Sequence, residues 1–273
     1  MEKFIVTPSS IARVGALLAV LFVVVGGVSV LTGTAGIGAA TVFRGVVTWW
    51  HEGYFILDPT EQTILFAIRL PRTLFAGIVG AALSTAGVVF QALLRNPLAD
   101  PYILGVSGGS AVGAIIGILL GAGAVPFGIP ALAFLGATLT VALVFVIGSR
   151  EGGLDSNTLL LAGVIVNAFF SAVIMFFIST SSSADLHTIT FWLMGDMGLA
   201  DGGKIGLMAL LLATGFGVVY RYARPLNLIV TGEETALQLG VDVKRTKIVL
   251  FVTGSLVTAV AVSFAGMIGF VGL

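Results

Sequence analysis

An all-α polytopic membrane protein is the fold class that this 273-residue sequence predicts. Hydrophobic residues make up 58% of the chain and charged residues only 10%, whereas an ordinary soluble domain carries about 25% charged residues. The apolar residues form long unbroken runs rather than alternating with polar ones, which predicts membrane-spanning helices and not barrel strands. The absence of cysteine excludes disulfides and thiol chemistry. We therefore expect one transmembrane domain over residues 1–273.

Uncharged runs predict seven membrane spans along the chain. The first follows a short polar leader and is longer than the apolar core of a signal peptide, so we expect it to be an uncleaved span. Pro97 and Pro101 separate the second run from the third and disfavour a continuous helix. The run 189–199 is too short to cross a hydrocarbon core of about 30 Å and is expected to lie along the membrane surface. The predicted spans cover residues 14–31, 72–94, 102–124, 131–148, 158–180, 205–220 and 248–273.

The distribution of Lys and Arg predicts a cytoplasmic N-terminus, because most of these cations then fall in inside segments. With alternating spans the inside set is Lys3, Arg13, Arg95, Arg150, Arg221, Arg224, Lys244, Arg245 and Lys247, and the outside set is Arg44, Arg69, Arg72 and Lys204. Arg69 and Arg72 stand together before the second span against this rule, so we expect an outside partner for them. The last run ends without a polar anchor, from which we expect a chain that is incomplete at its C-terminus.

Glycine recurs at every fourth position through the third predicted span. Gly105, Gly109, Gly113, Gly117 and Gly121 share one face of a helix. In water each costs about 0.5–1 kcal/mol relative to alanine, but in a membrane small residues at this spacing let helices pack closely. Two interpretations are open: a packing face between structural helices, or a face beside a permeation path or moving interface.

Polar side chains inside the predicted spans are few and uncharged. Ser84 and Thr85 lie in the second span, and Asn167 and Ser171 lie one turn apart in the fifth. No carboxylate is available in the spans for the proton or sodium relay that ion-coupled transporters use. These polar groups either form hydrogen bonds between helices or line a path, and both roles are open.

The sequence lacks motifs for catalysis and for cofactor binding. His51 and His187 stand in separate segments without a paired ligand spacing, which predicts no metal site. Residues 198–204 match the first seven positions of a phosphate-binding loop, but Ile205 stands where a Ser or Thr must reach Mg²⁺. We expect a transport subunit rather than an enzyme, with no cofactor of its own. If ATP powers it, ATP and Mg²⁺ bind to a partner subunit.

The polar segment 221–247, predicted to be cytoplasmic, contains a short helix with its own boundary signals. Thr231 and Glu234 form a capping-box pattern with Thr231 as the N-cap, and Gly240 is placed to end the helix. This helix is either part of a solvated connector or a docking element for a soluble partner. The residues assigned to it are Thr231, Gly232, Glu233, Glu234, Ala236, Leu239 and Gly240.

Five stretches resemble the FecCD/BtuC-like permeases of type II ABC importers, in the order of that family, and the resemblance extends over nearly the whole chain from about residue 62 onward. They are 69–114, with RLPRT and RNPLADP, 159–167 (LLLAGVIVN), 191–198 (FWLMGDMG), 224–242 (RPLNLIVTGEETALQLGVD) and 263–273 (SFAGMIGFVGL). The resemblance implies import of an iron–siderophore complex, haem or vitamin B12 across a bacterial or archaeal cytoplasmic membrane.

The resemblance also implies a fold and partners. Such permeases have ten transmembrane helices per subunit, work as dimers of one permease or of two homologues, and associate with a pair of cytoplasmic ATP-binding subunits and an extracytoplasmic binding protein. Arg69 and Arg72 match the outer arginines that dock on the binding protein, and 231–240 matches the helix that docks on the ATPase. About seven of the ten expected spans are present here, because the family continues beyond Leu273.

A stand-alone channel or an ion-coupled secondary transporter is the alternative function. It needs an intramembrane carboxylate, a filter-like ring of polar groups or inverted repeats, and the sequence shows none of these. Co-purification of an ATP-hydrolysing subunit separates the importer from this alternative.

Overall fold

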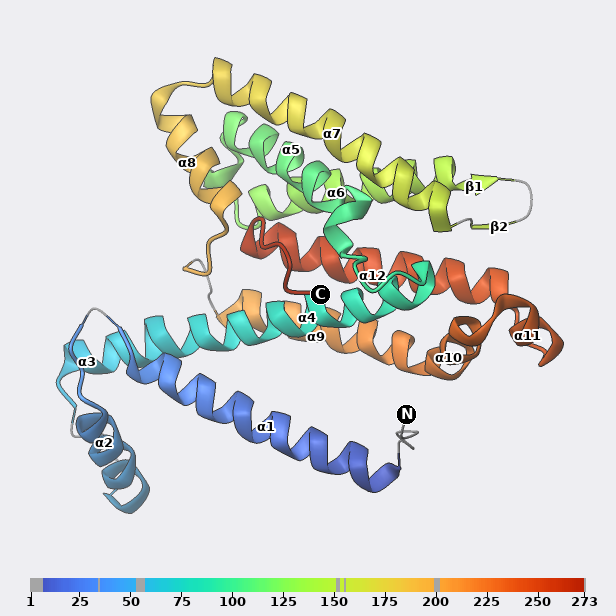
Figure 1. Ribbon diagram of the computed structural model, residues 1–273. Coiled ribbons are helices and arrows are strands. Elements are labelled where there is room, and N and C mark those ends of the chain that lie inside the picture. Colours follow the sequence, from blue (N-terminus) through green and yellow to red (C-terminus); the bar gives the residue numbers. More distant parts are fainter. Residues whose placement is uncertain are drawn as a thin grey trace. The chain divides into compact units, whose positions relative to one another are not determined.

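The computed structural model describes residues 7–33, 35–52, 57–150, 153–154, 156–198 and 202–272, and it confirms the prediction of an all-α protein (Figure 1). The helices are α1 Pro8–Leu31, α2 Ala39–Glu52, α3 Pro59–Thr63, α4 Leu70–Leu94, α5 Val106–Leu119, α6 Gly128–Gly148, α7 Ser156–Thr180, α8 Ser183–Met194, α9 Gly202–Arg221, α10 Ala223–Thr231, α11 Glu233–Gln238 and α12 Val243–Ala265. The strands β1 (Ser149–Arg150) and β2 (Gly153–Leu154) form a short antiparallel pair. The chain divides into two compact units, Met1–Ala76 and Gly77–Leu273.

Six of the described helices are long and apolar enough to cross a membrane, and a further apolar helix is shorter. These six correspond to the first, second, fourth, fifth, sixth and seventh predicted spans. They cover Ser9–Leu31, Pro59–Leu94, Gly128–Gly148, Ser156–Thr180, Gly202–Arg221 and Val243–Ala265, and the shorter helix is Val106–Leu119.

The third predicted span, 102–124, was wrong at both ends. Pro101–Leu104 form a 3-10 turn, and α5 begins only after Gly105, whose φ is 77°. A second left-handed glycine, Gly121 with φ 70°, follows the end of the helix. Such a conformation interrupts an α-helix at each place. The 14 residues of α5 extend about 21 Å, which is less than a hydrocarbon core of about 30 Å.

The second and the last predicted spans also have different boundaries. Helical structure before α4 begins at Pro59, where Asp58 and Glu61 form a capping box. A π-helical turn, Ile64–Arg69, then precedes Pro71, and its altered hydrogen-bond pattern accommodates a residue without an N–H. Arg69 and Arg72 therefore do not stand at the start of a helix. At the other end of the chain, α12 ends at Ala265 rather than at residue 273.

The first unit contains α1, α2 and α3. Thr7 accepts a hydrogen bond from the backbone N–H of Ser10 and caps α1, and the side chain of Ser10 accepts one in return. A small core of Ile37, Leu57 and Leu65 holds the segment after α1. The side chain of Leu57 lies 3.1 Å from the position of an added Cβ at Gly45, so α2 packs closely there.

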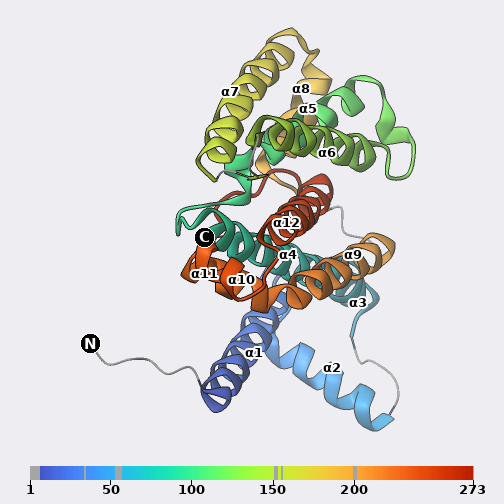
Figure 2. The same ribbon diagram turned by 90° about the vertical axis from the view of Figure 1, so that its right-hand side faces the viewer.

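In the second unit, α5 is a central and mostly buried helix. It contacts α6, α7, α8 and α12, and in both views it lies beside α6 and α7 (Figures 1 and 2). The core extends from α5 through α12 to α4, where the rings of Phe90 and Phe251 meet edge to face with centroids 6.0 Å apart. The short helix α8 folds back from the end of α7 and covers one end of α5 (Figure 1).

Candidate functional site

The predicted docking segment folds as two consecutive helices, α10 and α11. They pack on each other and on the start of α12 through the buried side chains of Ile229, Ala236 and Val243. Figure 1 shows α10 and α11 beside the first turns of α12. Because the pair shares one core, α10 and α11 are held together as one body.

Thr231 does not cap α11, contrary to the prediction. It is the last residue of α10, and its hydroxyl donates to the carbonyl of Leu228 at 2.8 Å. Gly232, with φ 152°, is the N-cap instead, and no side chain caps α11. The capping-box pattern failed because α10 precedes α11 directly and Thr231 bonds back within it.

Gly240 ends α11 as predicted. Its φ is 81°, and its N–H donates to the carbonyl of Leu237 at 3.0 Å. The N–H of Val241 donates to the carbonyl of Ala236, also at 3.0 Å. This pair of bonds is a Schellman motif, in which the left-handed residue is usually glycine.

The α10–α11 pair exposes apolar side chains on its outer surface. Val230, Leu237 and Leu239 are 48%, 58% and 62% exposed. Glu234, Arg224 and Lys244 are exposed in the same segment of the chain. Apolar side chains bordered by charges are typical of a surface that binds another protein.

Three charged side chains join this pair to two spanning helices. Nζ of Lys247, on α12, donates to Oε1 of Glu233 at 2.6 Å. Nη2 of Arg95, directly after α4, donates to the carbonyl of Ile229 at 2.7 Å and lies 3.6 Å from Oε1 of Glu233. Sequence reasoning assigned no role to Arg95 or Lys247. Arg95 and Ile229 are 134 positions apart, so the local sequence pattern carries no signal for their contact.

The end of α4 and the start of α7, which are both predicted to be cytoplasmic, meet in the second unit. Ser156, at the start of α7, donates through its hydroxyl to the carbonyl of Leu93 near the end of α4 at 3.2 Å. Three of the segments predicted to lie outside line a cavity of about 720 Å³, with residues such as Pro126, Trp192, Lys204 and Gly266. The orientation of the chain in the membrane stays a prediction.

Arg69 and Arg72, the two arginines predicted to dock on a binding protein, have different environments. The guanidinium of Arg69 is buried and donates to the carbonyls of Val30 at 3.1 Å, Leu31 at 3.2 Å and Ala35 at 2.6 Å. These carbonyls lie at and beyond the C-terminal end of α1, where a cation is favoured. Arg72 is exposed. Docking of a binding protein by both residues stays a prediction, and of the two only Arg72 presents its side chain at the surface.

The glycine face is closely packed against α6. An added Cβ at Gly109 meets the hydroxyl of Thr140, and one at Gly113 meets the carbonyl oxygen of Leu132. At Gly117 the nearest atom is Cδ1 of Leu132 at 3.2 Å. Gly105 and Gly121 lie outside the helix, so the expected five-residue face contains three glycines. Of the two interpretations, this geometry favours helix packing.

The four polar residues singled out within the predicted spans lie on two helices, α4 and α7. Asn167 is half-buried on α7, and its Oδ1 lies 2.8 Å from the position of an added Cβ at Gly108 on α5. Ser171 donates to the carbonyl of Asn167 within the same helix at 2.9 Å. Ser84 is exposed on α4, and Thr85 donates to the carbonyl of Ala81. A role of Ser84 or Asn167 in a path stays a prediction.

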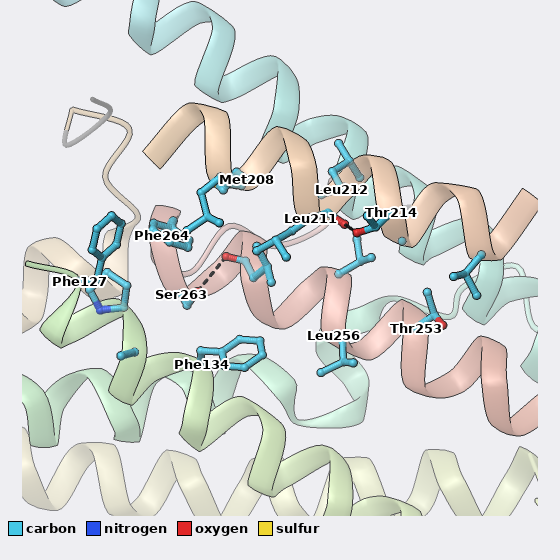
Figure 3. A pocket seen from close by; sticks show the side chains of 18 residues that line it. Phe127, Phe134, Met208, Leu211, Leu212, Thr214, Thr253, Leu256, Ser263 and Phe264 are labelled. Carbon is cyan, nitrogen blue, oxygen red and sulfur yellow. Dashed lines mark hydrogen bonds between the residues drawn. The ribbon is translucent and has the colours of Figure 1, made fainter. Parts of the chain in front are cut away.

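A cavity of about 590 Å³ lies between α6, α9 and α12 (Figure 3). Its lining is almost wholly apolar, with Phe134, Met208 and Leu256 among the contributing side chains. The hydroxyls of Thr214 and Ser263 donate to carbonyls of their own helices, those of Leu211 and Val260. The cavity therefore suits hydrocarbon and not a hydrated or charged molecule.

Within the described residues, no group of three His, Cys, Asp or Glu side chains is placed to hold a metal ion. Residues 199–201 of the stretch that resembles a phosphate-binding loop lie outside the described part of the chain. The docking and coupling roles assigned from the sequence stay predictions.

Comparison with known proteins gives a consistent family. A sequence model described as the FecCD transport family matches residues 9–273. The chain is 42% identical over 219 residues to the cobalamin import system permease protein BtuC of Halobacterium salinarum, covering 80% of this chain and 59% of that protein. It is 38% identical over 249 residues to the uncharacterized ABC transporter permease protein YvrB of Bacillus subtilis, covering 88% and 69%.

A bacterial relative and a solved structure extend the comparison. The vitamin B12 import system permease protein BtuC of Klebsiella pneumoniae is 39% identical over 218 residues, covering 80% of this chain and 65% of that protein. The chain thus spans between 59% and 69% of the length of these relatives. A structure described as an inward-facing conformation of a metal-chelate type ABC transporter matches with a TM-score of 0.79 at 30% identity, over 96% of this chain and 78% of that chain.

Proposed function

Because the chain belongs to the FecCD transport family, we propose that it is a membrane-spanning permease subunit of an ATP-binding-cassette importer in a bacterial or archaeal cytoplasmic membrane. The observation that carries the proposal is the family match over residues 9–273, which includes the α10–α11 pair. In this proposal a pair of cytoplasmic subunits binds ATP and Mg²⁺. An extracytoplasmic binding protein delivers the cargo, and a second permease copy or homologue completes the path.

The α10–α11 pair supports this proposal because it has the properties of a docking element. Its shared core makes it rigid, and its exposed Val230, Leu237 and Leu239 offer an apolar surface to a partner. Closure of the ATP-bound subunits then displaces the pair as one body. Such a displacement changes the tilt of spanning helices and alternates access to the two sides of the membrane.

Cobalamin is the cargo that we propose to test first, because relatives at 39% and 42% identity are named as cobalamin or vitamin B12 permeases. Iron–siderophore complexes and haem are the alternatives. All three are bulky metal chelates, the class of cargo in the description of the structural relative.

The experiment is purification of the tagged chain from its native host, followed by reconstitution in proteoliposomes. We expect an ATP-hydrolysing subunit to co-purify, and labelled cobalamin to enter the vesicles only when ATP and the loaded binding protein are present. If a ferric siderophore enters and cobalamin does not, the proposed cargo is wrong but the proposal of an ATP-driven importer stands. Uptake that needs no ATP and follows a proton or sodium gradient overturns the proposal and favours the ion-coupled alternative.

A further inference from the structure

Arg95, Glu233 and Lys247 come from three elements and meet at a single carboxylate. Glu233 is the first residue of α11, Lys247 lies in α12, and Arg95 directly follows α4. We call these three side chains the charged junction. Arg95 also reaches Ile229 in the last turn of α10, so the junction touches both helices of the α10–α11 pair.

The contacts of the charged junction differ in strength. The side chain of Lys247 is only 9% exposed, whereas those of Arg95 and Glu233 are 42% and 39% exposed. A buried ammonium depends strongly on its carboxylate, while a half-exposed ion pair at 3.6 Å contributes little. The main contribution of Arg95 is therefore its hydrogen bond to Ile229, a charged donor on a carbonyl at the C-terminal end of α10.

The backbone of Arg95 indicates that its side chain matters. Its φ is 48°, in the left-handed region that favours glycine. The N–H of Asn96 donates to the carbonyl of Gln91 at 3.1 Å, which is the bond expected when the preceding residue ends a helix in this conformation. Glycine suits this position better for the backbone alone. An arginine here places its guanidinium over the end of α10.

Lys247 also joins the ends of further spanning helices. Together with Leu93 and Leu94 of α4, Ser156 and Leu159 of α7, and Phe251 of α12, it lines a small cavity of about 10 Å³. The apolar stem of Lys247 therefore lies where α4, α7 and α12 meet, and its ammonium reaches Glu233 on α11.

We propose that the charged junction fixes the α10–α11 pair to the ends of α4 and α12, so that displacement of the pair is passed to both spanning helices. The inference rests on the proposed function, because an ATP-binding partner supplies the displacement. Arg95, Glu233 and Lys247 are positioning residues in this mechanism. Without the junction, the partner still binds and hydrolyses ATP, but less of the movement reaches the spans.

The test compares Glu233→Gln with the wild-type chain in the complete transporter, reconstituted with its ATP-binding subunits and binding protein. The measured quantity is cargo transported per ATP hydrolysed. We expect a fall of about tenfold or more, since a hydrogen bond between charged groups contributes that much to an equilibrium. Arg221→Gln is the control, because Arg221 is an exposed cation at the end of α9, outside the α10–α11 pair. It is expected to leave the ratio unchanged.

A double variant separates coupling from folding. Glu233→Gln leaves a buried ammonium with one carboxylate fewer and can lower the melting temperature by itself. Glu233→Gln with Lys247→Met removes both charges, so we expect the melting temperature to recover while the transport ratio stays low. Arg95→Gly keeps a backbone suited to its position, so we expect it to lower the ratio without destabilising the chain.

The outcomes are distinct. If the Glu233→Gln, Lys247→Met variant transports as much cargo per ATP as the wild type, the charged junction serves only stability. This result overturns the inference. A normal ratio in Glu233→Gln and in Arg95→Gly, with an ATP-driven wild type, also overturns the inference and leaves the proposed function in place. A wild-type chain that associates with no ATP-hydrolysing subunit overturns the proposed function itself.

Discussion

Gly113→Ala tests the packing of α5 on α6. The added Cβ would meet the carbonyl oxygen of Leu132, with the carbonyl carbon of Leu132 at 2.9 Å and Cα of Ala133 at 3.2 Å. All three atoms belong to the backbone of α6, so no side-chain rotation can relieve the contact. The two helices must move apart to admit one methyl group.

The expected loss of stability follows from two opposing contributions. Overpacking a tight contact costs about 1–3 kcal/mol, and the better helix propensity of alanine returns about 0.5–1 kcal/mol. Because the obstructing atoms at Gly113 are backbone atoms, we expect a net destabilisation of about 2 kcal/mol. This corresponds to a fall of about 4–8 °C in the melting temperature of a protein of this size.

The assay is thermal melting of the detergent-purified chain, followed by the loss of the monodisperse peak in size-exclusion chromatography. Gly117→Ala, one turn later, is the matched control. Its added Cβ meets Cδ1 of Leu132 at 3.2 Å, the end of a flexible side chain, so we expect no destabilisation. Equal melting temperatures for Gly113→Ala and Gly117→Ala would refute the packing argument.

Four further substitutions test other contacts. Arg72→Glu is expected to weaken the affinity for the binding protein, measured by pull-down, without changing the melting temperature. Arg69→Gln is expected to destabilise the chain by about 1–3 kcal/mol in thermal melting, because the carbonyls at the end of α1 lose their donor. The reverse pattern would contradict these assignments. Gly240→Pro should uncouple ATP hydrolysis from uptake, since proline fixes φ near −65° and the native φ is 81°; normal coupling counts against docking by α11. Gly87→Ala places a Cβ against the carbonyl of Gly272, so residues 266–272 should separate from α4 and become more sensitive to limited proteolysis; unchanged cleavage rates would show that the contact is dispensable.

Most spanning helices could be predicted from the sequence because a long uncharged run is itself the cause of a membrane helix. The third predicted span failed for a local reason. Its first and last glycines, Gly105 and Gly121, have positive φ, and regular spacing does not distinguish such glycines from helical ones. The run carries no charge, so hydropathy gave no sign of the two breaks.

The candidate site could be predicted only in part. Gly240 was correctly placed because a glycine after a short helix is a local signal. The prediction of Thr231 as the N-cap of α11 was wrong, because a sequence that fits a capping box can also continue the preceding helix, α10. Arg95 and Lys247 were assigned no role, since their meeting at Glu233 depends on how distant helices pack. The burial of Arg69 likewise depends on the end of α1, more than 30 residues earlier.

The shortness of α5 has a consequence for its surroundings in a bilayer. A helix exposed to lipid experiences hydrophobic mismatch, and a change in bilayer thickness tilts it or deforms the adjacent lipid. α5 is enclosed by α6, α7, α8 and α12 and is mostly buried, so hydrocarbon chains have little access to it. Bilayer thickness therefore constrains the exposed helices such as α7 and α9 directly, while the axial position of α5 is set by its protein neighbours alone.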